Sequence, residues 1–195
     1  MEWIAEWCLL ILIGVTLFDT EAGILSAVLF AAAVITGPAE AAAAAGTGAA
    51  VSRLFLWLWG RQLSLKNEAA DVLSNPCAYT IDKWQKYGLF WASFATMAVP
   101  AWRFRAAVTF GAKFAEKPFS AVVLACAAFI WTLAWVLLLV PVARLLIETS
   151  STVTAVRLIL PGLTLLMILT ASVSRTVLIR YYSRLREKKN ENSGR

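Results

Sequence analysis

Four ionisable residues stand in or against apolar stretches, where charged side chains are rare: Glu40, Arg53, Arg103 and Arg105. An ionised carboxylate at the centre of a bilayer is unfavourable by about 2.5–3.5 kcal/mol, unless it is protonated or paired with a cation. The guanidinium group of arginine offers planar, paired donors that match the oxygens of a phosphate. These residue types therefore predict a membrane site for an anionic lipid headgroup.

Each of these residues also has a purely structural interpretation. Glu40 could lie at the membrane surface and cap a helix that begins at Ala41, because an acidic residue is favourable there and Pro38 suits a helix start. Arg103 and Arg105 follow Trp102 and could extend to the membrane surface with their charged ends in water. Local sequence leaves both interpretations open.

The composition indicates the environment of these residues. Of 195 residues, 60% are apolar and 15% are charged, whereas a soluble domain carries about 25% charged residues. We therefore expect an all-α, polytopic integral membrane protein in which residues 1–182 form one domain. The chain has no histidine, and its three cysteines form no CxxC pair. We expect no catalytic residue, no metal site and no cofactor, and we do not expect an enzyme.

Two kinds of apolar segment follow along the chain. Residues 118–143 and 158–174 are uncharged and long enough to predict spanning helices. Residues 37–60 and 88–111 are apolar but interrupted by proline, glycine and ionisable residues, which is typical of re-entrant or broken helices. We predict two re-entrant hairpins in these segments and about four spanning helices in all.

Three further segments have a predicted role. The small residues of 41–50 are expected to allow close helix packing. Residues 61–86 are mixed and polar, and they predict a loop with a short helix around 66–74. Seven of the eighteen Lys and Arg residues lie at or after Arg175. By the positive-inside rule this predicts that residues 183–195 are a basic cytoplasmic tail, and not a nucleic-acid-binding segment.

The order of several short motifs resembles the DedA family, also called the VTT or SNARE-associated Golgi protein family. The motifs are Gly37-Pro38-Ala39-Glu40 with Gly46; Trp57-Leu58-Trp59-Gly60-Arg61; Lys86-Tyr87-Gly88 with Pro100-Ala101-Trp102-Arg103 and Gly111; and Phe119 with Trp131. The chain resembles a divergent member of the family. Arg53 stands where the family often has an aspartate, and Thr109 stands near the position of a second arginine.

The resemblance implies two re-entrant hairpins that meet near the bilayer midplane, with Glu40 on the first and Arg103 on the second. It also implies a transporter or scramblase in the bacterial inner membrane that moves polyprenyl phosphate or phospholipid between leaflets. We hypothesise that Glu40 pairs with Arg103 in the empty site and takes up a proton when a phosphate displaces it. The C-terminus is expected in the cytoplasm.

Two other functions fit the sequence less directly. A scaffold or assembly factor would use the tryptophan-rich helices to bind other membrane proteins or a second copy of this chain. Trp131 and Trp135, one helical turn apart, would suit packing or lipid contact in either case. A lipid-modifying enzyme ranks last, because no nucleophile elbow, phosphate loop or paired-carboxylate metal motif is present.

Overall fold

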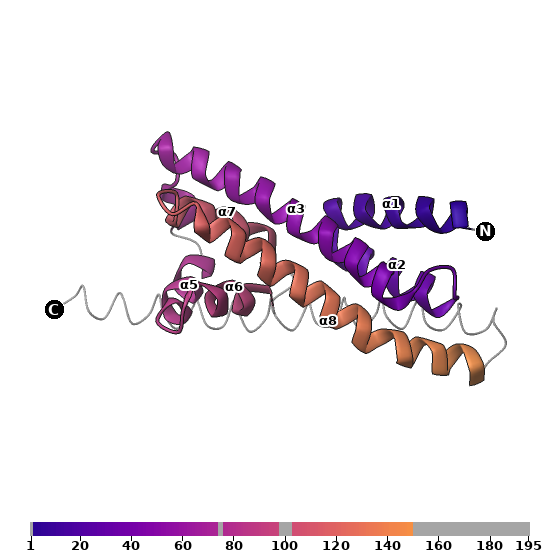
Figure 1. Ribbon diagram of the computed structural model, residues 1–195. Coiled ribbons are helices and arrows are strands. Elements are labelled where there is room, and N and C mark those ends of the chain that lie inside the picture. The colour runs from indigo at the N-terminus through magenta and orange to yellow at the C-terminus, as the bar shows by residue number, and fades with distance from the viewer. Residues whose placement is uncertain (1, 74–75, 98–102, 150–195) are drawn as a thin grey trace.

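The computed structural model describes residues 2–73, 76–97 and 103–149, and each regular element within them is an α-helix (Figure 1). The all-α prediction is therefore confirmed for the described part of the chain. Residues 158–174 and 183–195, predicted as a spanning helix and a basic tail, lie outside the described residues. The helices are α1 (Glu2–Phe18), α2 (Thr20–Ala32), α3 (Pro38–Leu65), α4 (Ala70–Leu73), α5 (Pro76–Gln85), α6 (Leu89–Met97), α7 (Arg103–Lys113) and α8 (Phe119–Thr149).

Two long antiparallel helices, α3 and α8, run through the molecule. The antiparallel register follows from two contacts: Gly46 of α3 packs on the ring of Phe129, and Trp57 Nε1 donates to Ser120 Oγ at 2.9 Å. Residues Pro38–Leu65 and Phe119–Leu145 are long and apolar enough to cross a membrane. The second stretch covers residues 119–143 of the span predicted at 118–143.

The first two helices fold back on each other beside the N-terminal half of α3. A β-carbon on Gly48 of α3 would lie 2.5 Å from the carbonyl oxygen of Ile13, so α1 packs closely on α3. The chain turns at Asp19, and α2 returns towards the end of α8, where Arg144 Nη2 donates to the Ala31 carbonyl at 3.1 Å. The closed end of the α1–α2 pair therefore lies beside the middle of α3 (Figure 1).

A second pair of short helices, α6 and α7, packs near the opposite end of α3. A β-carbon on Gly60 would lie 2.0 Å from the carbonyl oxygen of Val108, and one on Gly111 would lie 2.1 Å from that of Trp57. These two glycines let α3 and α7 touch backbone to backbone. On the other side, Phe94 of α6 packs edge-on against Trp131 of α8, with the ring centroids 5.0 Å apart.

The core has two parts that correspond to the two helix pairs. Around the α1–α2 pair, the buried side chains are mostly alanines together with Leu12, Val28 and Val136. Around the α6–α7 pair, larger side chains are buried, among them Trp57, Phe110 and Leu124. Small residues in the first cluster bring helices close together, whereas the second cluster also buries large aromatic side chains.

Two sequence predictions require correction. Residues 37–60, predicted as a re-entrant hairpin, lie in one continuous helix, because Gly37 and Pro38 mark its start and Gly46 and Gly48 serve close packing. Residues 61–86, predicted as a loop with a short helix around 66–74, include the end of α3, the short helix α4 within the predicted range, and the helix α5, which was not predicted. In the segment 88–111 the structure describes two helices, α6 and α7, and residues 98–102 between them lie outside the described residues. The predicted second hairpin stays a prediction.

Candidate anion-binding site between the helix pairs

Arg53 is the cation at the centre of α3. Only 4% of its surface is exposed. Its Nη2 donates to Thr20 Oγ1 at 3.2 Å, which joins α3 to the first turn of α2. The Nε atom of Arg53 is buried and has no hydrogen-bond partner among the described residues. Arg53 therefore keeps one donor that this arrangement of side chains does not satisfy.

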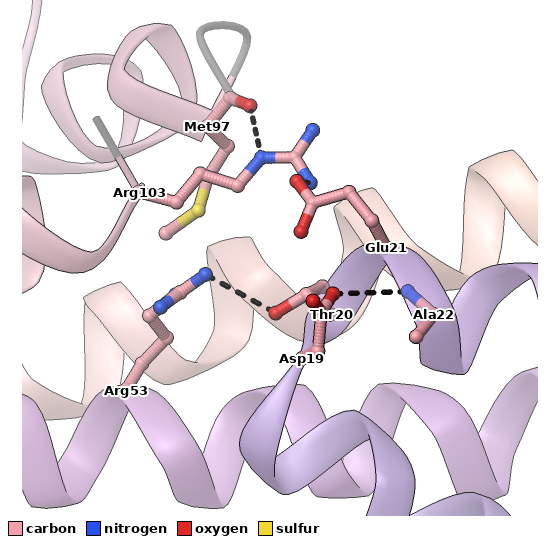
Figure 2. A network of polar contacts seen from close by, with 7 residues as sticks. All are labelled: Asp19, Thr20, Glu21, Ala22, Arg53, Met97 and Arg103. Atoms are coloured by element: carbon pink, nitrogen blue, oxygen red, sulfur yellow. Dashed lines mark hydrogen bonds and ion pairs between the residues drawn. The ribbon is translucent and has the colours of Figure 1, made fainter. Parts of the chain in front are cut away.

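Arg103, the first residue of α7, connects the two helix pairs (Figure 2). Its Nη1 forms an ion pair with Glu21 of α2. Its Nε donates to the Met97 carbonyl at the end of α6, at 2.8 Å. Its guanidinium carbon lies 5.7 Å from the ring centroid of Trp131, within the range of a cation–π contact. One side chain thus contacts α2, α6 and α8.

The turn at Asp19 explains why the first pair presents polar groups at its closed end. Asp19 has an extended backbone, with φ −140° and ψ 110°, and its Oδ1 accepts a hydrogen bond from Ala22 N at 3.0 Å. This is an N-cap, which satisfies one of the free N–H groups of a helix start. Thr20 and Glu21 consequently fall in the first turn of α2, where they meet Arg53 and Arg103.

The formal charges of the cluster balance. Arg53 and Arg103 contribute two positive charges, and Asp19 and Glu21 contribute two negative charges that both act electrostatically on Arg103. The side chain of Glu21 is 29% exposed, whereas that of Arg103 is 9% exposed. The carboxylate is therefore the more accessible member of the ion pair. The guanidinium is the more buried member, and its charge would be unfavourable there without an anionic partner.

The structure assigns Glu40 a different contact from the one expected. Glu40 is exposed, and its Oε2 accepts a hydrogen bond from Gly37 N at 3.1 Å at the start of α3. Glu40 does take part in a helix cap, but the helix begins at Pro38 and not at Ala41, and Glu40 lies in its first turn. The expected ion pair between Glu40 and Arg103 is wrong, because the carboxylate partner of Arg103 is Glu21. A role of Glu40 in transport stays a prediction.

Arg105 is not part of the cluster around Arg103. It is exposed on α7 and its charge acts on Cys77, which is buried in α5. Burial raises the pKa of the Cys77 thiol to about 12, and the nearby Arg105 opposes this rise only in part. Of the four predicted site residues, the structure therefore brings together Arg53 and Arg103, through Thr20 and Glu21.

Sequence reasoning missed Glu21 and Thr20 and did not recognise the contact of Trp131. Asp19-Thr20-Glu21 interrupts an apolar segment in the same way as Glu40 does. The argument that singled out Glu40, an acidic residue among apolar ones, therefore applies to Glu21 as well. Trp131 gave no such signal, since its contact with Arg103 depends on the packing of α6 and α7 against α8. Within the described residues, no group of three or more His, Cys, Asp or Glu side chains could hold a metal ion.

Comparison of the chain with protein-family models, with curated proteins and with solved structures gave no match.

Proposed function

We propose that this chain is a membrane protein that binds the phosphate of an anionic lipid and moves that lipid between leaflets, in the manner the DedA resemblance implies. One observation carries the proposal: two buried arginines, Arg53 and Arg103, meet the polar end of a helix pair between two apolar helices. A buried cation at membrane depth is costly, and such residues usually pair with another group and mark a substrate or ion pathway.

The position of the cluster along the two long helices supports this function. Arg53 is eight residues before Arg61 and thirteen after Glu40, so at about 1.5 Å per residue it is about 12 Å or more from either charge along α3. Trp131 lies about 18 Å from the start of α8 by the same measure. If α3 and α8 cross a bilayer, whose hydrocarbon core is about 30 Å thick, the cluster is far from both surfaces.

The short helix pairs add a second argument. The four helices α1, α2, α6 and α7 have 17, 13, 9 and 11 residues, fewer than the roughly 20 that a spanning helix needs. Helix ends at membrane depth are tolerated where they are buried in protein or line a wet cavity. Broken helices that meet from opposite ends are typical of transport sites.

The charge balance suggests how a phosphate would bind. Glu21 is the carboxylate that pairs with Arg103 in the structure described. A phosphate that displaced Glu21 would give Arg103 a replacement anion and would offer an acceptor to Arg53, whose Nε lacks one. The lipid tails would stay in the bilayer, beside the exposed apolar side chains of the long helices. These include Phe55, Leu58, Val122, Leu138, Val142 and Leu145.

The proposal is tested by lipid translocation in liposomes. The purified protein should expose fluorescent, phosphate-bearing lipids in the inner leaflet to a quencher outside. The double variant Arg53→Gln with Arg103→Gln should slow this exposure more than tenfold, because both cations that would hold the phosphate are removed. Lys83→Gln on the exposed face of α5 is the matched control, since it also removes a positive charge.

Two outcomes would contradict the proposal. One is that the double variant translocates lipid as fast as the unchanged protein while remaining folded. The other is that the unchanged protein translocates no lipid but co-purifies in fixed ratio with another membrane protein. The second outcome would favour the scaffold function instead.

A further inference from the structure

The indole nitrogen of Trp131 is a second buried donor without an acceptor. Trp131 lies on α8, and its Nε1 has no hydrogen-bond partner among the described residues although it is removed from solvent. A buried donor left unpaired costs about 1–3 kcal/mol. Tryptophan usually places its N–H against an acceptor when it is buried. The position therefore calls for an acceptor that the described residues do not supply.

The ring of Trp131 is held in place from two sides. Phe94 of α6 packs edge-on against it, with the centroids 5.0 Å apart, and Trp135 packs one turn further along α8, with the centroids 5.9 Å apart. The guanidinium of Arg103 lies 5.7 Å from the ring centroid. The indole is thus a fixed neighbour of the cation that would hold the phosphate.

Other unpaired polar atoms occur on the helices that contact this cluster. Arg53 Nε on α3 and Ser93 Oγ on α6 are also buried and without partners in the described part of the chain. Ser93 is the immediate neighbour of Phe94, which touches Trp131. Buried polar atoms without partners therefore occur on α3, α6 and α8, and they also include Arg61 Nε, Thr132 Oγ1 and Arg144 Nε. Most buried polar groups in native proteins are paired.

We propose that Trp131 is a binding residue of the anion site and that its indole N–H donates to an oxygen of a phosphate held by Arg103. This inference rests on the proposed function, and it adds an uncharged donor to the two arginines. A phosphate carries several acceptor oxygens, so it has acceptors for both Arg103 and Trp131. The ligand class is a phosphate ester, carried on a lipid or free in solution.

The test measures binding to the full chain in detergent by calorimetry, with two probes: dihexanoyl phosphatidic acid and inorganic phosphate. Trp131→Phe keeps an aromatic ring beside Arg103 but removes the N–H. We expect it to weaken binding of the lipid probe by about tenfold or more, as for the loss of a hydrogen bond to a charged group. Trp135→Phe, one turn away and partly exposed, is the matched control and should stay within about twofold.

A second variant separates the hydrogen bond from packing. Replacement of Trp131 with 3-benzothienylalanine keeps the bicyclic shape and lacks only the N–H. If Trp131 acts as a donor, this variant should bind the lipid probe as weakly as Trp131→Phe while its melting temperature stays near that of the unchanged protein. Restored binding with the isostere would show a packing role and overturn the inference.

The remaining outcomes separate this inference from the proposed function. If the unchanged protein binds the lipid probe and Trp131→Phe binds it equally well, the donor role alone is wrong. If the unchanged protein binds neither probe, the proposed function fails and the donor role fails with it. Equal affinity for inorganic phosphate and for phosphatidic acid would identify the headgroup phosphate as the sole recognised feature; tighter binding of the lipid would identify the tail as a second one.

Discussion

At the scale of single residues, the cluster is organised around Arg103. Its partners come from three helices, and Glu21 is 82 residues away in sequence. Arg53 and Arg103 could be predicted, since a charge among apolar residues is visible in the sequence alone. Their partners could not, because a contact between α2 and α7 depends on how both helix pairs pack against α3.

The ion pair between Glu21 and Arg103 gives the first prediction. Glu21→Gln and Arg103→Gln should each lower the free energy of unfolding, by an amount between the roughly 0.2–1 kcal/mol of an exposed pair and the roughly 3–5 kcal/mol of a buried one. Arg103→Gln should have the larger effect, because its side chain also bonds the Met97 carbonyl. Thermal unfolding of both single variants and the double variant measures the coupling.

The control for this cycle is Lys113→Gln, which removes a more exposed ion pair with Asp82. It should change the unfolding free energy by about 1 kcal/mol or less. If the changes in unfolding free energy of Glu21→Gln and Arg103→Gln simply add in the double variant, the two side chains do not interact. That result would contradict the ion pair in the structure.

Cys77 provides a prediction on pH dependence. Its pKa is raised to about 12 by burial, so the folded protein keeps the neutral thiol at pH values where an ordinary thiol, near 9, ionises. A variant with Cys8→Ala and Cys126→Ala should react slowly with N-ethylmaleimide at pH 8. Its rate should still be rising above pH 10, where the same chain unfolded in detergent approaches a plateau. Fast labelling of the folded chain at pH 8 would contradict this prediction.

At the scale of elements, glycines lie where helices pack most closely. The sequence predicted this close packing correctly but predicted the continuity of α3 incorrectly. The small residues of 41–50 were expected to pack closely, and Gly46 and Gly48 do so. The same glycines, with Pro38, also suggested a broken segment, yet α3 continues from Pro38 to Leu65. Proline at the first position of a helix removes an N–H that would be unpaired in any case, so it marks a start as readily as a break.

The crossing of α3 and α7 gives the third prediction. Gly60→Ala and Gly111→Ala would each place a methyl group about 2 Å from a backbone carbonyl oxygen of the other helix. Each should lower the free energy of unfolding by about 1–3 kcal/mol, since backbone atoms must move apart to relieve the overlap. Differential scanning fluorimetry in detergent would show the loss as a lower melting temperature.

Gly14→Ala is the matched control for this substitution. A β-carbon at Gly14 of α1 would meet nothing within 4 Å. Alanine is the better helix former, by about 0.5–1 kcal/mol, so this variant should be unchanged or more stable. Equal destabilisation at Gly14, Gly60 and Gly111 would show that helix contact is not what the two crossing glycines serve.

At the scale of the whole molecule, the charges are distributed unevenly between the two ends. The end that contains the C-termini of α3 and α7 together with α5 carries six basic residues (Figure 1): Arg61, Lys66, Lys83, Lys86, Lys113 and Lys117. The opposite end, with the start of α1, the α2–α3 connection and the end of α8, carries Arg144 alone among the basic residues described there. The positive-inside rule predicts that the first end is cytoplasmic.

This orientation gives the fourth prediction, tested with single cysteines in bacterial cells. In a chain without its native cysteines, Lys83→Cys, at an exposed position of α5, should resist a membrane-impermeant maleimide until the cells are opened. Ile35→Cys, exposed between α2 and α3, should react in intact cells, because it lies at the other end of α3.

The basic tail predicted at residues 183–195 extends this test. If the apolar residues 158–174 cross the membrane, the tail lies on the same side as Lys83, in agreement with the positive-inside rule. A cysteine in that tail should then share the labelling pattern of Lys83→Cys. Labelling of Ile35→Cys and Lys83→Cys from the same side would mean that α3 does not cross the bilayer, and it would contradict the proposed mid-membrane position of Arg53.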